Sequence, residues 1–136
     1  NHDVPPFTGW WQHDDLDIKQ QYKLITCNEY EQLKQQRIEE QQRLLRFINH
    51  HGNTTELLLH SEAVTVYSAL ALCLAGSQSR LFAIQIDDLD EQQYPVNIPG
   101  TDKEYPNWRR VLTHTSEEIF TKNGSLLAAI DSIRKG

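Results

Sequence analysis

The sequence contains no methionine, only two cysteines and no long uninterrupted apolar stretch. A natural chain starts from a start codon, so a methionine-free sequence that opens at Asn1 predicts a processed product or an expressed fragment. Cys27 and Cys73 are too few for a disulfide framework and lack a metal-binding spacing, so we predict two small, buried thiols. The longest apolar run, about residues 63–75, is interrupted by polar residues and is too short to cross a membrane.

Basic residues are also scarce. The chain has 19 acidic and 13 basic residues and a net charge of −6, which argues against a nucleic-acid partner because phosphate backbones require a basic patch. No basic-then-apolar signal segment opens the chain, so the cytoplasm is the expected location. A length of 136 residues fits one compact domain, residues 1–136, with a moderate core.

The six histidines do not form a metal-binding pattern. His50 and His51 are adjacent, so their rings point apart on a helix, and the other histidines are isolated. The phosphate-binding, zinc-protease and hydrolase motifs are absent as well. We therefore expect neither a metal nor a cofactor.

Two segments have the pattern of helices. The first begins near Asn28, a predicted N-cap with Glu31 in the capping-box position, and its apolar residues recur at helical spacing up to Gly52, a predicted left-handed C-cap. The second runs from Ser61, a predicted cap, to Gly76. Because this second helix is apolar on nearly every side, we expect protein to surround it.

One short run has the composition of a strand. Residues 81–86 are apolar and partly β-branched, which is typical of a strand buried on both faces in a parallel sheet, and an acidic loop follows at 87–91. Two short helices are predicted to close the chain, one after a capping box of Thr115 and Glu118 and one over 125–135. A single strand cannot form a sheet, so the pattern indicates an excerpt from a larger α/β architecture.

Two loops concentrate residue types that suit a binding site. The first 15 residues contain Pro and Gly and are predicted to be irregular, with His2 and Asp3 close to Trp10 and Trp11. A carboxylate and an imidazole can bond to sugar hydroxyls, and exposed indoles can stack on a pyranose. The alternative is an ordinary turn with both tryptophans in the core, the commoner fate of this residue.

The second loop covers residues 96–101 and 104–110. Its Pro99–Gly100 pair favours a tight turn that exposes backbone groups, and Trp108 with the two arginines after it is suited to anchor the loop by packing and salt bridges. Two interpretations remain open here, a structural clamp and a ligand contact.

These two loops resemble those of amylomaltases, also called disproportionating enzymes or 4-α-glucanotransferases of the bacterial maltose system. The resemblance rests on residues 1–5, 9–11, 97–101 and 105–110, and the last two blocks are the most specific. It implies the C-terminal portion of a (β/α)₈ barrel, from about the end of strand 7 to the last helix, with residues 81–86 as strand 8.

The resemblance also implies a function and a site. Members move α-1,4-glucan segments between malto-oligosaccharides by a retaining double displacement. By resemblance, Asp3 is the third catalytic carboxylate and His2 assists it. The positions implied to contact the substrate are Asn97, Gly100, Thr101, Trp10 and Trp11.

The same resemblance indicates what is missing. Retaining transfer needs a nucleophile and an acid/base carboxyl about 5 Å apart, and the family carries both on earlier strands. A barrel takes about 250 residues, so we predict that the isolated chain is inactive, predominantly helical and prone to self-association. The alternative is an independently folding helical module that binds maltodextrin or a protein partner without catalysis.

Overall fold

The computed structural model describes residues 3–52 and 55–135, and within these ranges it contains seven α-helices and no β-strand. The helices are α1 (Phe7–Gln12), α2 (Asp14–Gln21), α3 (Cys27–His51), α4 (Ala63–Ala75), α5 (Ile86–Leu89), α6 (Ser116–Lys122) and α7 (Gly124–Lys135). The expectation that the chain by itself is predominantly helical is therefore confirmed.

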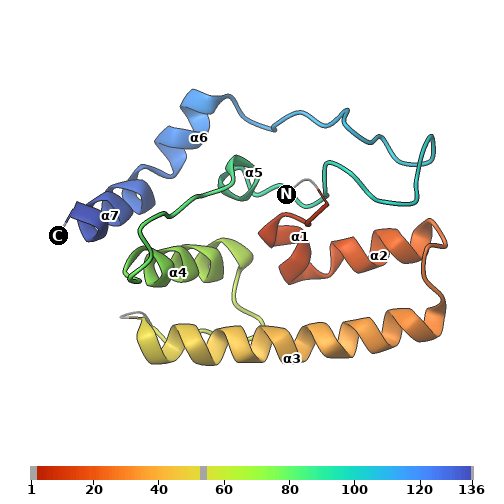
Figure 1. Cartoon of the computed structure of the whole chain (residues 1–136), viewed down its shortest axis with the longest axis horizontal. Helices are drawn as coiled ribbons and strands as arrows, with labels where there is room; N and C mark the ends of the chain where they lie inside the picture. The colour runs from red at the N-terminus through yellow and green to blue at the C-terminus, as the bar shows by residue number, and fades with distance from the viewer. Residues whose placement is uncertain (1–2, 53–54, 136) are drawn as a thin grey trace.

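The helices pack around α3 and α4 (Figure 1). Helix α3 runs along one side of the molecule, α2 and α4 contact it, and α1 lies between α2 and α4. Helix α7 covers another part of α4. The irregular chain between α5 and α6 passes over α2, where Ile98 and Tyr105 pack against Ile18.

The main core lies where α1, α3 and α4 meet. Ile48 of α3 and Val66 of α4 are completely buried there, and Trp11 of α1 is only 6% exposed. A second cluster joins α4 to α7 through Ala71, Ala75 and Ile130. Burying a large aliphatic or aromatic side chain contributes about 1.5–3 kcal/mol, so these contacts hold the short N-terminal helix in place.

The N-cap of α3 lies two residues before the predicted one, Asn28. Thr26 is the N-cap: its hydroxyl accepts from Glu29 N at 3.3 Å, and Thr26 N donates to Glu29 Oε2 at 2.8 Å. Thr26 and Asn28 have the same capping-box spacing, and use of the earlier one lengthens the helix. Gly52 ends α3 as predicted, but its φ of −86° is not left-handed, and Cys27 at the helix start is exposed rather than buried.

The N-terminal segment is helical where we predicted an irregular loop. Pro6 is the N-cap of α1, where a fixed φ suits the start of a helix, and His13 turns the chain into α2 with a left-handed φ of 72°. The indoles that made the segment resemble a loop pack instead into the core. Helix α2 begins with three aspartates in its first turn, which the helix dipole favours.

Residues 81–85 form no strand. Phe82 and Ile84 pack against the α4–α7 cluster, but Leu81 is 90% exposed, so the prediction of burial on both faces is wrong. The alternation of a strand is retained without its hydrogen bonds, because the described residues offer no neighbouring strand to pair with. Ile86, the predicted end of the strand, begins α5.

The remaining helix predictions are mixed. Gly76 ends α4 as expected, but Glu62 is its N-cap, and the Ser61 hydroxyl instead accepts from Leu58 N at 2.9 Å. Helix α4 is not surrounded on all sides, since Leu74 is 43% exposed. The capping box of α6 is confirmed, as is α7 within one residue of its predicted start. None of the helices described for residues 3–52 and 55–135 has the length and apolar character needed to cross a membrane.

Candidate functional site

The fold brings together Asp3 and Asn97, which are 94 residues apart in the sequence. Asn97 Nδ2 donates a hydrogen bond to Asp3 Oδ1 at 2.8 Å. Asp3 precedes the first turn of α1, and Asn97 lies in the irregular segment between α5 and α6. The predicted partner of Asp3, His2, lies outside the described residues.

A pocket of about 320 Å³ opens beside this pair. Its polar wall includes Asp3, Asn97, Asp15 and Lys19, whereas most of the remaining wall is apolar. The apolar side chains come from the end of α2, the turn after it and the proline-rich loop, and include Ile18, Leu24, Ile25 and Ile98. A pocket with apolar walls and a few convergent polar groups is the usual form of a small-molecule site.

Asn107 holds the tight turn at residues 98–101. Its Oδ1 accepts from Ile98 N at 2.9 Å, and its Nδ2 donates to the Thr101 hydroxyl at 2.9 Å. The Thr101 hydroxyl in turn donates to Ile98 O at 2.7 Å. The hydroxyl of Thr101, one of the predicted substrate contacts, therefore forms hydrogen bonds within this turn and stabilises its shape.

Gly100 supplies the backbone conformation of the same turn. Its φ is 90°, a region that side chains disfavour, and a Cβ there would lie 3.5 Å from Leu24 of the α2–α3 connection. That distance is an ordinary van der Waals contact, so the backbone conformation, and not a lack of space, is what favours glycine here.

Tyr105 anchors the loop, a role the sequence had suggested for Trp108. Tyr105 is 2% exposed, its hydroxyl donates to Pro95 O, and its ring meets the ring of Tyr22, the C-cap of α2, edge-on. Arg110 Nε donates to the Tyr105 hydroxyl at 2.9 Å and its guanidinium lies over the Tyr94 ring. Burial raises the pKa of the Tyr105 hydroxyl, and the nearby Arg110 opposes that rise. Trp108, the predicted anchor, is 62% exposed, so a different residue anchors the loop.

The two tryptophans are not presented as exposed stacking platforms in this structure. Trp11 lies in the core, and its indole N–H donates to Ser61 O at 3.0 Å. Trp10 is half-buried, with the Arg37 guanidinium 5.0 Å from its ring centre and Phe7 beside it. The core interpretation describes their places better than the expectation of exposed indoles.

A buried ion pair behind the pocket was missed by the sequence analysis. Arg37 donates to both oxygens of Asp15, at 2.8 and 2.9 Å, and also to Trp10 O at 2.7 Å. Gln41, one turn further along α3, donates to Trp11 O at 2.7 Å. Both residues fall within the apolar stripe of α3 between Leu33 and Leu45, and a charge in such a stripe is the signal that would have revealed the pair.

Asp88 ties the start of α1 to α5. Its Oδ1 accepts from Phe7 N at 2.7 Å, across 81 residues of sequence. Burial raises the pKa of the Asp88 carboxyl above its ordinary value, and the Phe7 hydrogen bond opposes that rise. The acidic run at 87–91, which we predicted to be a loop, thus contains the residue that fixes the segment that follows Asp3.

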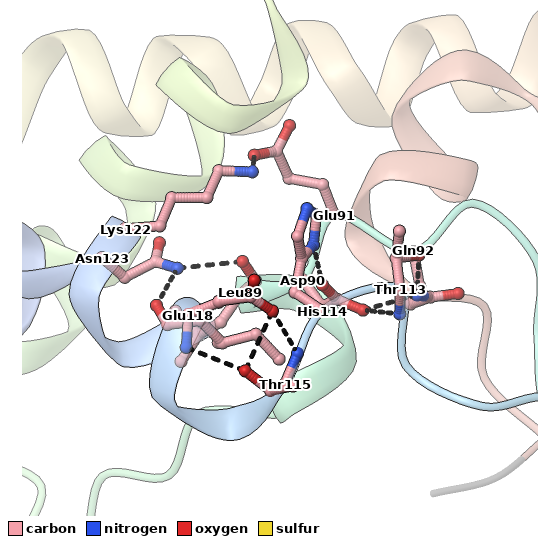
Figure 2. Close-up of polar contacts among 11 residues, drawn as sticks. Leu89, Asp90, Glu91, Gln92, Thr113, His114, Thr115, Glu118, Lys122 and Asn123 are labelled. Atoms are coloured by element: carbon pink, nitrogen blue, oxygen red, sulfur yellow. Dashed lines mark hydrogen bonds and ion pairs between the residues drawn. The ribbon is translucent and has the colours of Figure 1, made fainter.

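Asp90, in the same acidic run, organises a second polar centre (Figure 2). Its side chain is fully buried and accepts hydrogen bonds from His114 Nδ1 at 2.7 Å, Gln92 Nε2 at 2.6 Å and Thr113 N at 2.6 Å. Asn123 extends the connection by donating to Leu89 O at 3.0 Å. Burial works against the charge on Asp90, but these hydrogen bonds outweigh it and hold the pKa of the carboxyl below its ordinary value.

Acidification is expected to weaken this centre. Because the folded-state pKa of Asp90 lies below its ordinary value of 3.8, the ionised carboxylate stabilises the fold above pH 3.8. That stabilisation is lost as the pH falls through the lowered folded-state value. We expect the unfolding free energies of wild type and Asp90→Asn to converge below pH 4, measured by urea titration at pH 7, 5, 4 and 3. A difference that stays constant over this range would contradict the ionised Asp90 network.

No group of three or more His, Cys, Asp or Glu side chains within residues 3–52 and 55–135 could hold a metal ion. The polar groups of the pocket are carboxylate, amide and ammonium, which suits hydrogen bonding to hydroxyls. The site can therefore offer hydrogen bonds to the polar groups of a ligand that its apolar walls contact.

Comparison with known proteins gives consistent matches. The family model for 4-alpha-glucanotransferases, glycoside hydrolase family 77, matches residues 1–115. A 4-alpha-glucanotransferase of Haemophilus influenzae is 28% identical over 143 aligned positions, which cover 99% of this chain and 20% of that protein. Enzymes of the same name from Mycobacterium bovis and Mycobacterium tuberculosis are each 29% identical over 88% of this chain. The chain thus spans about a fifth of the length of these curated relatives.

Proposed function

Because the chain belongs to the 4-alpha-glucanotransferase family, we propose that it forms part of an enzyme that transfers α-1,4-glucan segments between malto-oligosaccharides. The observation that carries this proposal is the Asp3–Asn97 pair beside the pocket, since both residues lie in family-matched segments and the fold joins them. The relatives that bear the name of this activity are about five times as long as this chain.

In this proposal residues 1–136 are the C-terminal portion of a single (β/α)₈-barrel catalytic domain. In the whole enzyme, residues 81–85, which form no strand in this chain, would be the last strand of the barrel, and the arrangement of Phe82 and Ile84 supports this. These side chains face the helices, as the outward side chains of a barrel strand do, and Leu81 and Ala83 are exposed on the opposite side. The exposed side would then face the barrel interior.

The roles proposed for the site residues follow from that placement. Asp3 accepts hydrogen bonds from hydroxyls of the sugar at the cleavage point, and His2 assists it. Asn97 lies at the substrate-facing edge of the loop, while Gly100 and Thr101 give this edge its shape. For the tryptophans the proposal is narrower: Trp10 has exposed surface to offer a sugar, and Trp11 supports it from the core.

Asp3 and Asp15 are the two carboxylates on the described pocket wall, and they do not make a catalytic pair. A retaining transfer needs one carboxylate as nucleophile and another carboxyl as acid/base. Asp15 accepts two hydrogen bonds from Arg37 and is 3% exposed, so it can neither attack a sugar nor deliver a proton. We therefore propose that these 136 residues alone do not catalyse the transfer.

The isolated chain is expected to produce no glucose and no longer oligosaccharides from maltotriose, as followed by chromatography. The control is the full-length enzyme, which should disproportionate maltotriose and lose that activity with Asp3→Asn. Products formed by the isolated chain and abolished by Asp3→Asn would refute the proposal that the nucleophile and acid/base lie elsewhere.

A second candidate is a non-catalytic module that binds maltodextrin, which the preformed pocket favours. Titration calorimetry of the isolated chain with maltoheptaose separates the two. Binding that Asp3→Asn weakens, without turnover by the full-length protein, would favour the module.

We also propose that the protein acts in the cytoplasm without a cofactor, and that the isolated chain self-associates through exposed apolar residues such as Leu81.

A further inference from the structure

We propose that Asn97 is a positioning residue, which orients the carboxylate of Asp3 by donating a hydrogen bond to its Oδ1. This inference rests on the proposed function, in which Asp3 contacts the sugar. It assigns Asn97 a role through Asp3 that is distinct from direct contact with the glucan.

The backbone on both sides of Asn97 is held in place. Ile98 is 2% exposed and packs against Ile18 of α2. The fixing hydrogen bonds run from the Tyr105 hydroxyl to Pro95 O, from Trp108 N to Val96 O at 3.0 Å, and from Ile98 N to Asn107 Oδ1 at 2.9 Å. Residues 95, 96 and 98 are thus all fixed, so the amide of Asn97 starts from a rigid base.

Asp3 lies outside the helices. It is exposed and lies four residues before the start of α1. The nearest fixed point of this segment is Phe7 N, which Asp88 holds at 2.7 Å. A donor on a rigid loop, at 2.8 Å from Asp3 Oδ1, helps to define the plane of the carboxylate.

The chemistry of the contact allows one direction only. An ionised carboxylate accepts hydrogen bonds and cannot donate them, and of the two atoms on the Asn97 amide only Nδ2 donates. The reverse amide orientation would place the Asn97 carbonyl oxygen against Asp3 Oδ1 and repel it. Asn97 thus serves as a directional donor, and an isosteric replacement without a donor should fail.

The expected kinetic effect is a fall in kcat at nearly constant KM. In the full-length enzyme, Asn97→Ala is expected to lower kcat roughly tenfold to a hundredfold, because a small displacement of a catalytic group costs about this much. KM for maltotriose should change less than about threefold, since the lost interaction matters in the transition state. Asn97→Asp keeps the shape of the side chain but sets two carboxylates about 2.8 Å apart, so it should lower kcat at least as much as Asn97→Ala does. Asn97→Gln keeps a donor and should retain part of the wild-type kcat.

The experiment compares these three variants with Asp3→Asn and with Asn123→Ala in the full-length enzyme. Asn123 is a matched control because its amide bonds to Leu89 O and Ile119 O, on the α5–α6 side of the fold. Asn123→Ala should leave kcat unchanged. Melting temperatures of all variants separate a loss of fold from a loss of positioning. If Asn97→Ala unfolds, Asn97→Asp still tests the positioning role, because it preserves the volume of the side chain.

The outcomes test separately the positioning role of Asn97 and the catalytic role proposed for Asp3. A low kcat for Asn97→Ala and Asn97→Asp, with unchanged KM and melting temperature, supports the positioning role. If Asp3→Asn is inactive but Asn97→Asp has wild-type kcat, the positioning role is overturned and the proposed function stands. A rise in KM alone would also overturn it, since Asn97 would then bind the glucan directly. Full activity of Asp3→Asn would instead refute the catalytic role proposed for Asp3.

Discussion

Replacement of Gly9 by alanine is expected to destabilise the fold by at least about 3 kcal/mol, the upper range of overpacking. A Cβ at Gly9 would lie 1.7 Å from Gln93 O and 2.8 Å from Gln93 C. Both are backbone atoms, so no side-chain rotation relieves the clash, and either α1 or the segment around Gln93 has to move. Because α1 also carries Trp11 into the core, its displacement would disturb the main hydrophobic cluster.

Gly124→Ala is the matched control for this substitution. A Cβ at Gly124 has no atom within 4 Å, and the residue begins α7, where alanine is the better helix former. We expect wild-type stability or a gain of up to about 1 kcal/mol. Urea unfolding followed by circular dichroism measures both variants. If Gly9→Ala were as stable as Gly124→Ala, α1 would not lie against Gln93.

Replacement of Arg37 by alanine is expected to cost about 3–5 kcal/mol, as for other broken buried pairs. The change leaves Asp15 buried and charged without its guanidinium partner, and it leaves Trp10 O without the donor at 2.7 Å. It also removes the cation over the Trp10 ring. Since Asp15 lines the pocket, we expect the pocket wall to loosen together with the α2–α3 contact.

Two comparisons isolate the cause of that loss. Lys135→Ala, which breaks an ion pair with Asp131 whose side chains are 75% and 60% exposed, should cost less than about 1 kcal/mol. Asp15→Leu added to Arg37→Met should recover much of the stability, because it removes the unpaired charge as well. An Arg37→Ala variant no less stable than Lys135→Ala would show that the Arg37–Asp15 pair does not hold α2 on α3.

Helices with strong local signals were predictable from the sequence. The Thr115–Glu118 box and the apolar periodicity of α7 specify these elements without help from distant residues. Thr26 and Asn28 offered the same capping-box spacing, so local pattern could not choose between them. The prediction for the start of the chain was wrong for another reason. Its prolines, glycine and paired tryptophans indicate a loop, but packing of Trp11 in one cluster with Ile48 and Val66 stabilises a helix.

The site was predictable only in part. The resemblance to amylomaltases drew attention to Asp3 and Asn97, but nothing in the sequence indicated that one donates a hydrogen bond to the other across 94 residues. Asp88 looked like part of an acidic turn, and its bond to Phe7 N depends on the tertiary arrangement of α1 and α5. The burial of Arg37 could have been predicted, since a charged residue in the apolar stripe of α3 indicates a buried partner of opposite charge.

The hydrogen bonds of the loop and those of the Asp3 pair form at different times during synthesis of the chain. The bonds of Tyr105, Asn107 and Arg110 within the loop span ten residues or fewer, so they can close soon after these residues are made. Asp3 has to wait for Asn97, 94 residues later, which corresponds to roughly 5–20 s at ordinary translation rates. A ribosome-bound chain that ends before residue 97 therefore carries an Asp3 whose positioning partner does not yet exist.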